Sequence, residues 1–172
     1  MTAFAWIDDL SREDGLSSLG TRWALVTDGV MGGVSAGRLQ RENLAGPPAL
    51  RMRGTVSVEN NGGFLQMALD LTPSGGPMDA GRWTGIELEI CGNAETYGLH
   101  LRTSDLSRPW QSYRQGFLAP PVWTVLRLPF DGFAPHRTDI PLNPGRLRRL
   151  GLVAIGRPFT ADLALGGLRF YA

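Results

Sequence analysis

The residues Gly33-Val34-Ser35-Ala36-Gly37 match the G-x-S-x-G pattern, in which a serine serves as the nucleophile of acyl-transfer enzymes. That chemistry requires a sharp turn from a strand into a helix, a histidine base and a downstream acid. His100 and His136 are the only histidines, and no alternation of strands and helices surrounds Ser35. We therefore expect Ser35 to be non-catalytic and the protein not to be an enzyme.

Metal and cofactor sites have little support in the sequence. Neither histidine has a partner at metal-ligand spacing, and Cys91 is the only cysteine, which excludes a cysteine-based metal site and an intrachain disulfide. Asp28, Asp105 and Asp131 could meet at the edges of a sandwich and hold Ca²⁺, but their spacing does not require it. The segment Gly151–Gly156 is a buried strand bounded by glycines, not a phosphate-binding loop. We expect no metal and no cofactor.

A group of aromatic and polar residues is the best candidate for a binding face. Trp110, Gln111, Tyr113 and Arg114 fall in one predicted strand, and Arg102 falls in the preceding one. A Trp or Tyr ring beside Arg and Gln suits stacking and hydrogen bonding to a polar ligand or a peptide. The spacing of three puts Trp110 and Tyr113 on opposite faces of a regular strand, so we expect Arg102 to share an accessible face with only one of them. The alternative is that both aromatic residues pack in the core.

Two glycine-rich segments are unusual for loops. The first is Asp28-Gly29-Val30-Met31-Gly32-Gly33-Val34-Ser35, and the second is Asn60-Asn61-Gly62-Gly63-Phe64. Glycine alone adopts positive φ without a steric penalty, so we expect at least one of Gly32 and Gly33 to do so. The Asp28 carboxylate should accept hydrogen bonds from backbone N–H groups of its own loop. We predict a structural role for both segments.

Period-two alternation predicts the elements that must position these residues. Strands are expected over residues 50–59, 64–70, 86–90, 97–102, 110–118, 123–130, 147–156 and 159–171, the last interrupted at Gly166-Gly167. One face of the first four strands should be buried, namely Leu50, Met52, Val56, Val58, Leu65, Met67, Leu69, Ile86, Leu88, Ile90, Tyr97, Leu99 and Leu101. Arg51, Arg53, Glu87 and Glu89 should then face water.

Helical signals are weak. Residues 11–18 could form one short helix with Ser11 as its N-cap, and residues 131–145 look like a loop rich in Pro and Gly. Many short strands separated by turn signals favour a sandwich or a barrel. We predict an all-β fold in which two antiparallel sheets form a jelly-roll-like sandwich.

Composition excludes several classes of function. The chain has 172 residues, which favours a single domain over 1–172. Its net charge of +1 does not indicate binding to nucleic acid or to an anionic membrane. All 17 basic residues are Arg, which we interpret as a trait of a high-GC genome. No window approaches the ~20 apolar residues of a membrane span. The N-terminus carries early acids and neither a secretory nor a mitochondrial signal, so we expect a cytoplasmic protein.

The order of several motifs resembles one known family, that of the complex I intermediate-associated protein 30. The resemblance runs from about Trp23 to the end of the chain. It is carried by Trp23, the run Asp28 to Ser35, Asn61-Gly62-Gly63-Phe64, Tyr97, Leu99, Leu101, Arg102, Trp110, Tyr113, Trp123 and Leu128-Pro129-Phe130. The most specific of these is the run D-G-V-M-G-G-x-S.

The resemblance implies a galactose-binding-like jelly roll, similar to certain carbohydrate-binding modules. It also implies a non-enzymatic, chaperone-like assembly factor for respiratory complex I, the NADH:ubiquinone oxidoreductase. We expect a bacterial, cytoplasmic member whose partner is a protein, such as a complex I subunit or an assembly intermediate. The alternative is a module that binds a glycan or another small ligand. Fold likeness alone does not decide between the two.

Overall fold

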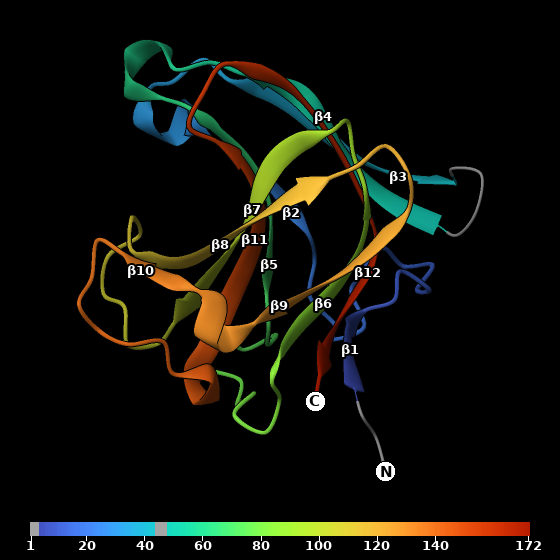
Figure 1. Cartoon of the computed structure of the whole chain (residues 1–172), viewed down its shortest axis with the longest axis vertical. Helices are drawn as coiled ribbons and strands as arrows, with labels where there is room; N and C mark the ends of the chain where they lie inside the picture. Colours follow the sequence, from blue (N-terminus) through green and yellow to red (C-terminus); the bar gives the residue numbers. More distant parts are fainter. Residues whose placement is uncertain (1–3, 44–47) are drawn as a thin grey trace.

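Alternating apolar and polar residues fold the chain into two antiparallel sheets that pack face to face (Figure 1). The structure is a computed structural model that describes residues 4–43 and 48–172. The first sheet has the order β3 (Ala36–Asn43), β4 (Pro48–Val56), β12 (Phe159–Tyr171), β6 (Gly85–Cys91) and β9 (Thr124–Pro129), with β1 (Phe4–Asp8) also paired to β12. The second has the order β10 (Ala134–His136), β8 (Ser112–Ala119), β7 (Glu95–Thr103), β11 (Leu147–Ile155), β5 (Phe64–Asp70) and β2 (Ala24–Thr27).

The helical part of the described chain consists of short 3-10 helices. They are η1 (Asp28–Met31), η2 (Glu59–Asn61), η3 (Phe130–Gly132) and η4 (Pro144–Arg146). The predicted all-β jelly-roll sandwich is therefore confirmed. The two ends of the described chain lie side by side, because β1 pairs with the C-terminal part of β12 (Figure 1).

The core between the sheets contains the predicted apolar faces. All the side chains predicted to be buried are buried except Val58, which is 46% exposed because β4 ends at Val56. A buried hydrogen bond ties the N-terminal strand to the core, since Nε1 of Trp23 donates to the Asp8 carboxylate at 2.7 Å. The predicted interruption at Gly166-Gly167 is a break in the register between β12 and β6.

The predicted helix over residues 11–18 is wrong, because local side chains bond the backbone first. The Asp9 carboxylate accepts the N–H of Ser11 at 3.0 Å, and that of Asp14 accepts the N–H of Leu16 at 3.1 Å. These Asx-type turns offer the backbone an alternative to the helical hydrogen bonds. Gly15, at φ 80°, turns the segment further.

Several boundaries also differ from the prediction. The strand expected from residue 110 begins at Ser112, and the predicted loop over 131–145 contains the short strand β10. Strands β1, β2 and β3 were not predicted. The first two are short, and β3 is an edge strand with mostly polar, exposed side chains, so none has a long apolar alternation.

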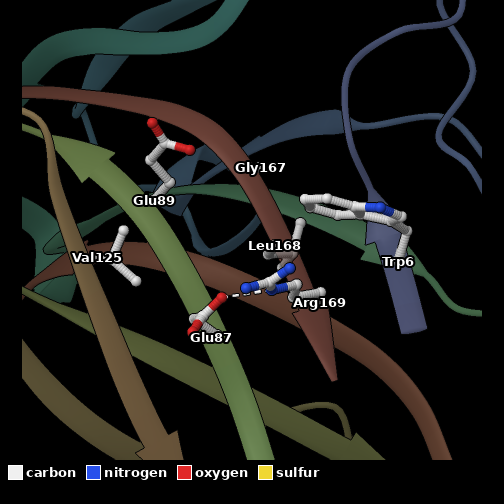
Figure 2. A pocket seen from close by; sticks show the side chains of 7 residues that line it. All are labelled: Trp6, Glu87, Glu89, Val125, Gly167, Leu168 and Arg169. Carbon is white, nitrogen blue, oxygen red and sulfur yellow. Dashed lines mark hydrogen bonds and ion pairs between the residues drawn. The ribbon is translucent and has the colours of Figure 1, made fainter. Parts of the chain in front are cut away.

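Glu87 departs from the predicted solvent face of β6. It is 7% exposed, although its alternation puts it on the outer side of the sheet. Its carboxylate accepts a hydrogen bond from Nε of Arg127 at 3.1 Å. It accepts another from Nε of Arg169, and Figure 2 shows this second contact. Burial alone would raise the pKa of Glu87, but the two arginines outweigh it and lower the pKa. The side chain is thus covered by its partners and not by the core.

Candidate ligand-binding groove

A groove with a volume of about 960 Å³ runs over the outer face of the second sheet. On β7, the lining residues His100 and Arg102 alternate with Leu99 and Leu101, which are fully buried between the sheets. Strands β2, β5, β8, β10 and β11 also contribute lining residues. The groove is therefore built from the side chains that strand alternation turns away from the core.

The strand register brings basic side chains together on this face. Arg102 of β7 is paired with Arg149 of β11, and His100 of β7 is paired with Arg114 of β8. Directly opposed residues of antiparallel strands point to the same face with their Cβ atoms about 5 Å apart. We name these groups and their neighbours the basic cluster, which comprises His100, Arg102, Arg114, His136, Arg137 and Arg149.

Bringing the basic cluster together is electrostatically unfavourable for the folded protein. Burial lowers the pKa of Arg102, and the nearby charges of Arg148 and Arg149 add to this effect. Burial also lowers the pKa of His100 to about 3, with a further contribution from the charge of Arg114. His100 is therefore neutral at pH 7, and the native state disfavours the cationic form of Arg102 relative to water.

The two glycine-rich segments meet at the other end of the groove. Helices η1 and η2 lie beside each other at one corner of the molecule (Figure 1). The backbone N–H groups of Gly63 and Phe64 donate to Oδ2 of Asp28 at 2.6 and 3.2 Å, and the N–H of Ser35 donates to Oδ1 at 3.0 Å. The predicted bond from the loop of Asp28 is thus present, and the second segment adds two more.

Asp28 is fully buried within these donors. Burial alone would raise its pKa, but the hydrogen bonds from Ser35, Gly63 and Phe64 together lower it. The hydroxyl of Ser35 also donates to Asp28 and accepts the N–H of Ser57 at 2.8 Å. Ser35 is occupied in holding the loops together, and no helix follows it, because β3 begins at the next residue.

The glycines of these segments leave room for the buried carboxylate. Gly32 has φ 84°, which confirms that one of the pair adopts a positive φ. A Cβ on Gly33 would lie 2.4 Å from Cγ of Asp28, and one on Gly62 would lie 2.6 Å from Oδ2. Gly29 fixes the start of η1, where its N–H donates to Oγ1 of Thr27 at 3.1 Å.

The groove contains residues from both predicted groups. The lining includes Met31, Gly62, Gly63 and Phe64 from the glycine-rich segments, and Arg102 and Trp110 from the predicted binding face. Trp110 lies in the loop before β8 and is 60% exposed, with the Arg108 guanidinium 5.9 Å from the centre of its ring.

Two residues of the predicted binding face do not line the groove. Tyr113 is fully buried, and its hydroxyl donates to the carbonyl oxygen of Ile140 at 2.9 Å, so Trp110 is the one aromatic residue of the pair that shares the accessible face with Arg102. Gln111 instead holds the loop that carries Trp110. Its side chain accepts the N–H of Arg108 at 3.0 Å and donates to the carbonyl oxygen of Arg137 at 3.0 Å.

Sequence reasoning did not assign His100, His136, Arg137 or Arg149 to the site. Alternation along β7 and β11 places His100 and Arg149 on the outer faces of their strands. Their convergence depends on which strands are neighbours, and β7 and β11 are far apart in the sequence. The register between the two strands is the missing information.

Residues 4–43 and 48–172 contain neither a clustered metal-ligand set nor a helix that could cross a membrane. No group of three or more His, Cys, Asp or Glu side chains in that part of the chain is arranged to hold a metal ion. None of its helices has the length and apolar character needed to cross a membrane.

A second, smaller cavity of about 180 Å³ lies on the outer face of the first sheet (Figure 2). Arg169 lies between Trp6 and Glu87, with its guanidinium 5.3 Å from the centre of the Trp6 ring. Glu87 is already paired with Arg127 and Arg169, and the cavity is much smaller than the groove on the second sheet. We therefore regard the larger groove as the candidate site.

Comparison with known proteins identifies one family. The model of the family described as complex I intermediate-associated protein 30 (CIA30) matches residues 13–165. No curated protein sequence matches the chain at a significant level.

Solved structures with a similar fold include carbohydrate-binding modules. The family 11 module of the cellulosomal cellulase Lic26A-Cel5E of Clostridium thermocellum has a TM-score of 0.74 and 10% identity over 100% of this chain and 96% of that chain. The same family's module from Clostridium thermocellum, in complex with a β-1,3-1,4-mixed-linked tetrasaccharide, has a TM-score of 0.76 and 11% identity over 100% and 97%. The agarase AgWH50C has a TM-score of 0.64 and 10% identity over 99% of this chain and 25% of that chain. At these identities the likeness shows the fold alone.

Proposed function

The chain belongs to the complex I intermediate-associated protein 30 family, and we propose that it is a non-catalytic binding protein that holds its partner in the groove of the second sheet. The main support for this proposal is that the glycine-rich segments line the same groove as Arg102 and Trp110. Convergent polar groups in a groove are typical of a binding site. The Ser35 hydroxyl already bonds Asp28 and Ser57, which supports binding over acyl-transfer chemistry.

We propose a protein as the partner, namely a subunit or an assembly intermediate of respiratory complex I that is bound in the cytoplasm. The description of the family supports this choice. So does the presence of exposed apolar side chains in the groove, because Val30 and Met31 are 77% and 60% exposed. Such side chains favour contact with the apolar residues of an incompletely assembled protein.

Carbohydrate binding is a second candidate function. The exposed ring of Trp110 favours it, since an aromatic face stacks well on a sugar ring. The fold is also shared with modules that bind carbohydrate.

Site-specific photocrosslinking tests the proposed function. A benzoylphenylalanine in place of Trp110 should give covalent adducts with a complex I subunit or assembly intermediate in respiring cells. The same residue at Val125, which is 59% exposed on the first sheet, is the matched control and should give none. Equal adducts at both positions, or none at Trp110, would refute the protein-partner proposal. Retardation of the protein in gels that contain mixed-linkage β-glucan would favour the second candidate.

A further inference from the structure

The groove has two chemically different halves. The basic cluster occupies the half formed by β7, β8, β10 and the start of β11. No Asp or Glu lines the groove in the part of the chain that the structure describes. The single ion pair that the cluster makes there is between Arg149 and Asp70, at 3.5 Å and partly exposed. The cluster therefore has an excess of positive charge.

Arg102 has hydrogen-bonding capacity that the fold does not use. Its terminal NH2 group donates to the carbonyl oxygen of Arg108 at 3.0 Å. Its Nε atom is buried and has no hydrogen-bond partner among the described residues. An unsatisfied buried donor costs free energy, and a negatively charged acceptor would satisfy it best.

The other half of the groove is apolar. Its lining includes Val26, Val30, Met31, Phe64, Val153 and Ile155. The register places Val153 of β11 opposite Gln66 and Ile155 opposite Phe64, on the side of the sheet where the glycine-rich segments lie. The groove thus favours negative charge on the ligand at one end and apolar ligand surface at the other.

We propose that the groove binds an extended segment of a partner protein whose Asp or Glu side chains meet the basic cluster and whose apolar side chains meet the other half. This inference rests on the proposed function and specifies the chemistry of the partner. Arginine guanidinium groups recognise carboxylates with paired, directional hydrogen bonds. The cost of gathering like charges in the free protein is then offset on binding.

An acidic polysaccharide fits this surface less well than a peptide. Such a polymer carries charge at regular intervals, whereas the basic cluster is confined to one half of the groove. An aromatic ring stacks on a sugar, and Trp110 is the one lining Trp or Tyr among the described residues, so the groove offers a glycan a single such ring. A polypeptide segment can place carboxylates and apolar side chains next to each other in any order.

Selection from a displayed library of random peptides tests the inference. Peptides of about twelve residues, enough to span such a groove when extended, are selected on the whole protein. We expect enrichment of sequences with an acidic half and an apolar half. A selected peptide should bind at least about tenfold more weakly to the double variant Arg114→Gln/Arg149→Gln, and more weakly at high salt. Arg38→Gln makes a single matched charge change on β3 of the other sheet and should leave the Kd unchanged.

Arg149→Gln alone is a second variant whose folding is not at risk, because the Arg149 side chain is 37% exposed and its ion pair is weak. Replacing the acidic residues of the peptide by their amides should weaken binding to the wild type. The same replacement should have little further effect on binding to the double variant. Such non-additivity would show that the acidic residues of the peptide interact with Arg114 and Arg149. Equal effects of the amide peptide on both proteins would contradict the inference.

The variant Gly151→Leu separates this inference from the proposed function. It adds a side chain to the groove floor, where the close contact of its Cβ is with the flexible end of Gln66. If selected peptides lack acidic residues yet lose binding to Gly151→Leu, the charge inference fails and the groove remains a protein-binding site. If no selected peptide loses binding to Gly151→Leu, no peptide occupies the groove, and the proposed function fails as well. Arginine-dependent binding of oligogalacturonate in place of peptide would overturn the inference in favour of an acidic glycan.

Discussion

Asp28 and Gly63 are 35 residues apart in the chain, and the N–H of Gly63 donates to Oδ2 of Asp28 at 2.6 Å. This bond joins the two glycine-rich segments, each of which is recognisable in the sequence without the other. The carboxylate is a buried acceptor for the N–H groups of Ser35, Gly63 and Phe64. The end of the groove at Met31 and Phe64 is therefore positioned by one buried charge.

Replacing that charge should destabilise the protein. In Asp28→Asn, the amide presents an N–H group toward the donors of Ser35 or Gly63, so a buried donor loses its acceptor. We expect a loss of about 2 kcal/mol or more in the free energy of unfolding. Urea titration of Asp28→Asn, with the exposed Asp139→Asn as control, measures this effect. Equal stability of the two variants would show that the Asp28 network contributes little.

Two adjacent glycines should respond differently to alanine. A Cβ on Gly32 meets nothing within 4 Å, so Gly32→Ala should cost only the strain of its φ of 84°, about 1 kcal/mol. A Cβ on Gly33 would lie 2.4 Å from Cγ of Asp28, so Gly33→Ala should cost clearly more, because the buried carboxylate must move. Thermal unfolding of both variants gives the comparison. A larger loss for Gly32→Ala would contradict the packing argument.

The core faces of the sheets could be predicted because burial follows alternation. Ile86, Leu88 and Ile90 are fully buried, as their spacing indicates. Glu87 is an exception to this rule, because its burial results from Arg127 and Arg169 on neighbouring strands. A local pattern assigns a side chain to one face but does not contain its partners across the sheet.

The candidate site could be predicted only in part, for the same reason. Arg102 and Trp110 were selected by type, and both line the groove. The spacing of Trp110 and Tyr113 predicts that only one of them is accessible, but it does not say which, and Tyr113 is the buried one. Arg149 was missed because its closeness to Arg102 arises from the pairing of β7 with β11.

The stability of the protein should fall in mildly acidic solution through His100. In the folded protein its pKa is about 3, whereas the ordinary value is 6.5. As the pH falls below 6.5, the unfolded chain therefore takes up a proton that the folded protein does not, and the free energy of unfolding decreases. His136 acts in the same direction, because burial, Arg114 and Arg137 also lower its pKa.

The variant His100→Gln should remove most of this decrease. Between pH 6.5 and about 5 the wild type should lose about 1–2 kcal/mol that the variant keeps. The buried carboxylates of Asp28 and Glu87 contribute little in this range, because their pKa values are lowered from ordinary values of 3.8 and 4.5, which already lie below pH 5. Urea titrations at several pH values provide the measurement. Parallel pH profiles for wild type and His100→Gln would show that His100 titrates normally in the folded state.

Arg102 and Arg51 should differ in what their charges contribute to folding. The guanidinium of Arg51 donates to the Asp162 carboxylate at 2.7 Å through both Nε and one terminal nitrogen, and it pairs with Glu42 at 3.0 Å. Hydrogen bonds to these two carboxylates raise the pKa of Arg51, whereas burial lowers that of Arg102. The fold therefore stabilises the charge of Arg51 and disfavours that of Arg102.

Methionine at each position keeps an aliphatic side chain and removes the charge. Arg51→Met should lose about 2 kcal/mol in the free energy of unfolding, because the Asp162 carboxylate loses its partner and Glu42 keeps only Arg53. Arg102→Met should change it by about 1 kcal/mol or less, because relief from Arg148 and Arg149 offsets the lost hydrogen bond to Arg108. Binding of an acidic peptide should show the reverse order, with a loss for Arg102→Met and no change for Arg51→Met. A large loss of stability in Arg102→Met would instead make Arg102 a structural cation and remove it from the binding surface.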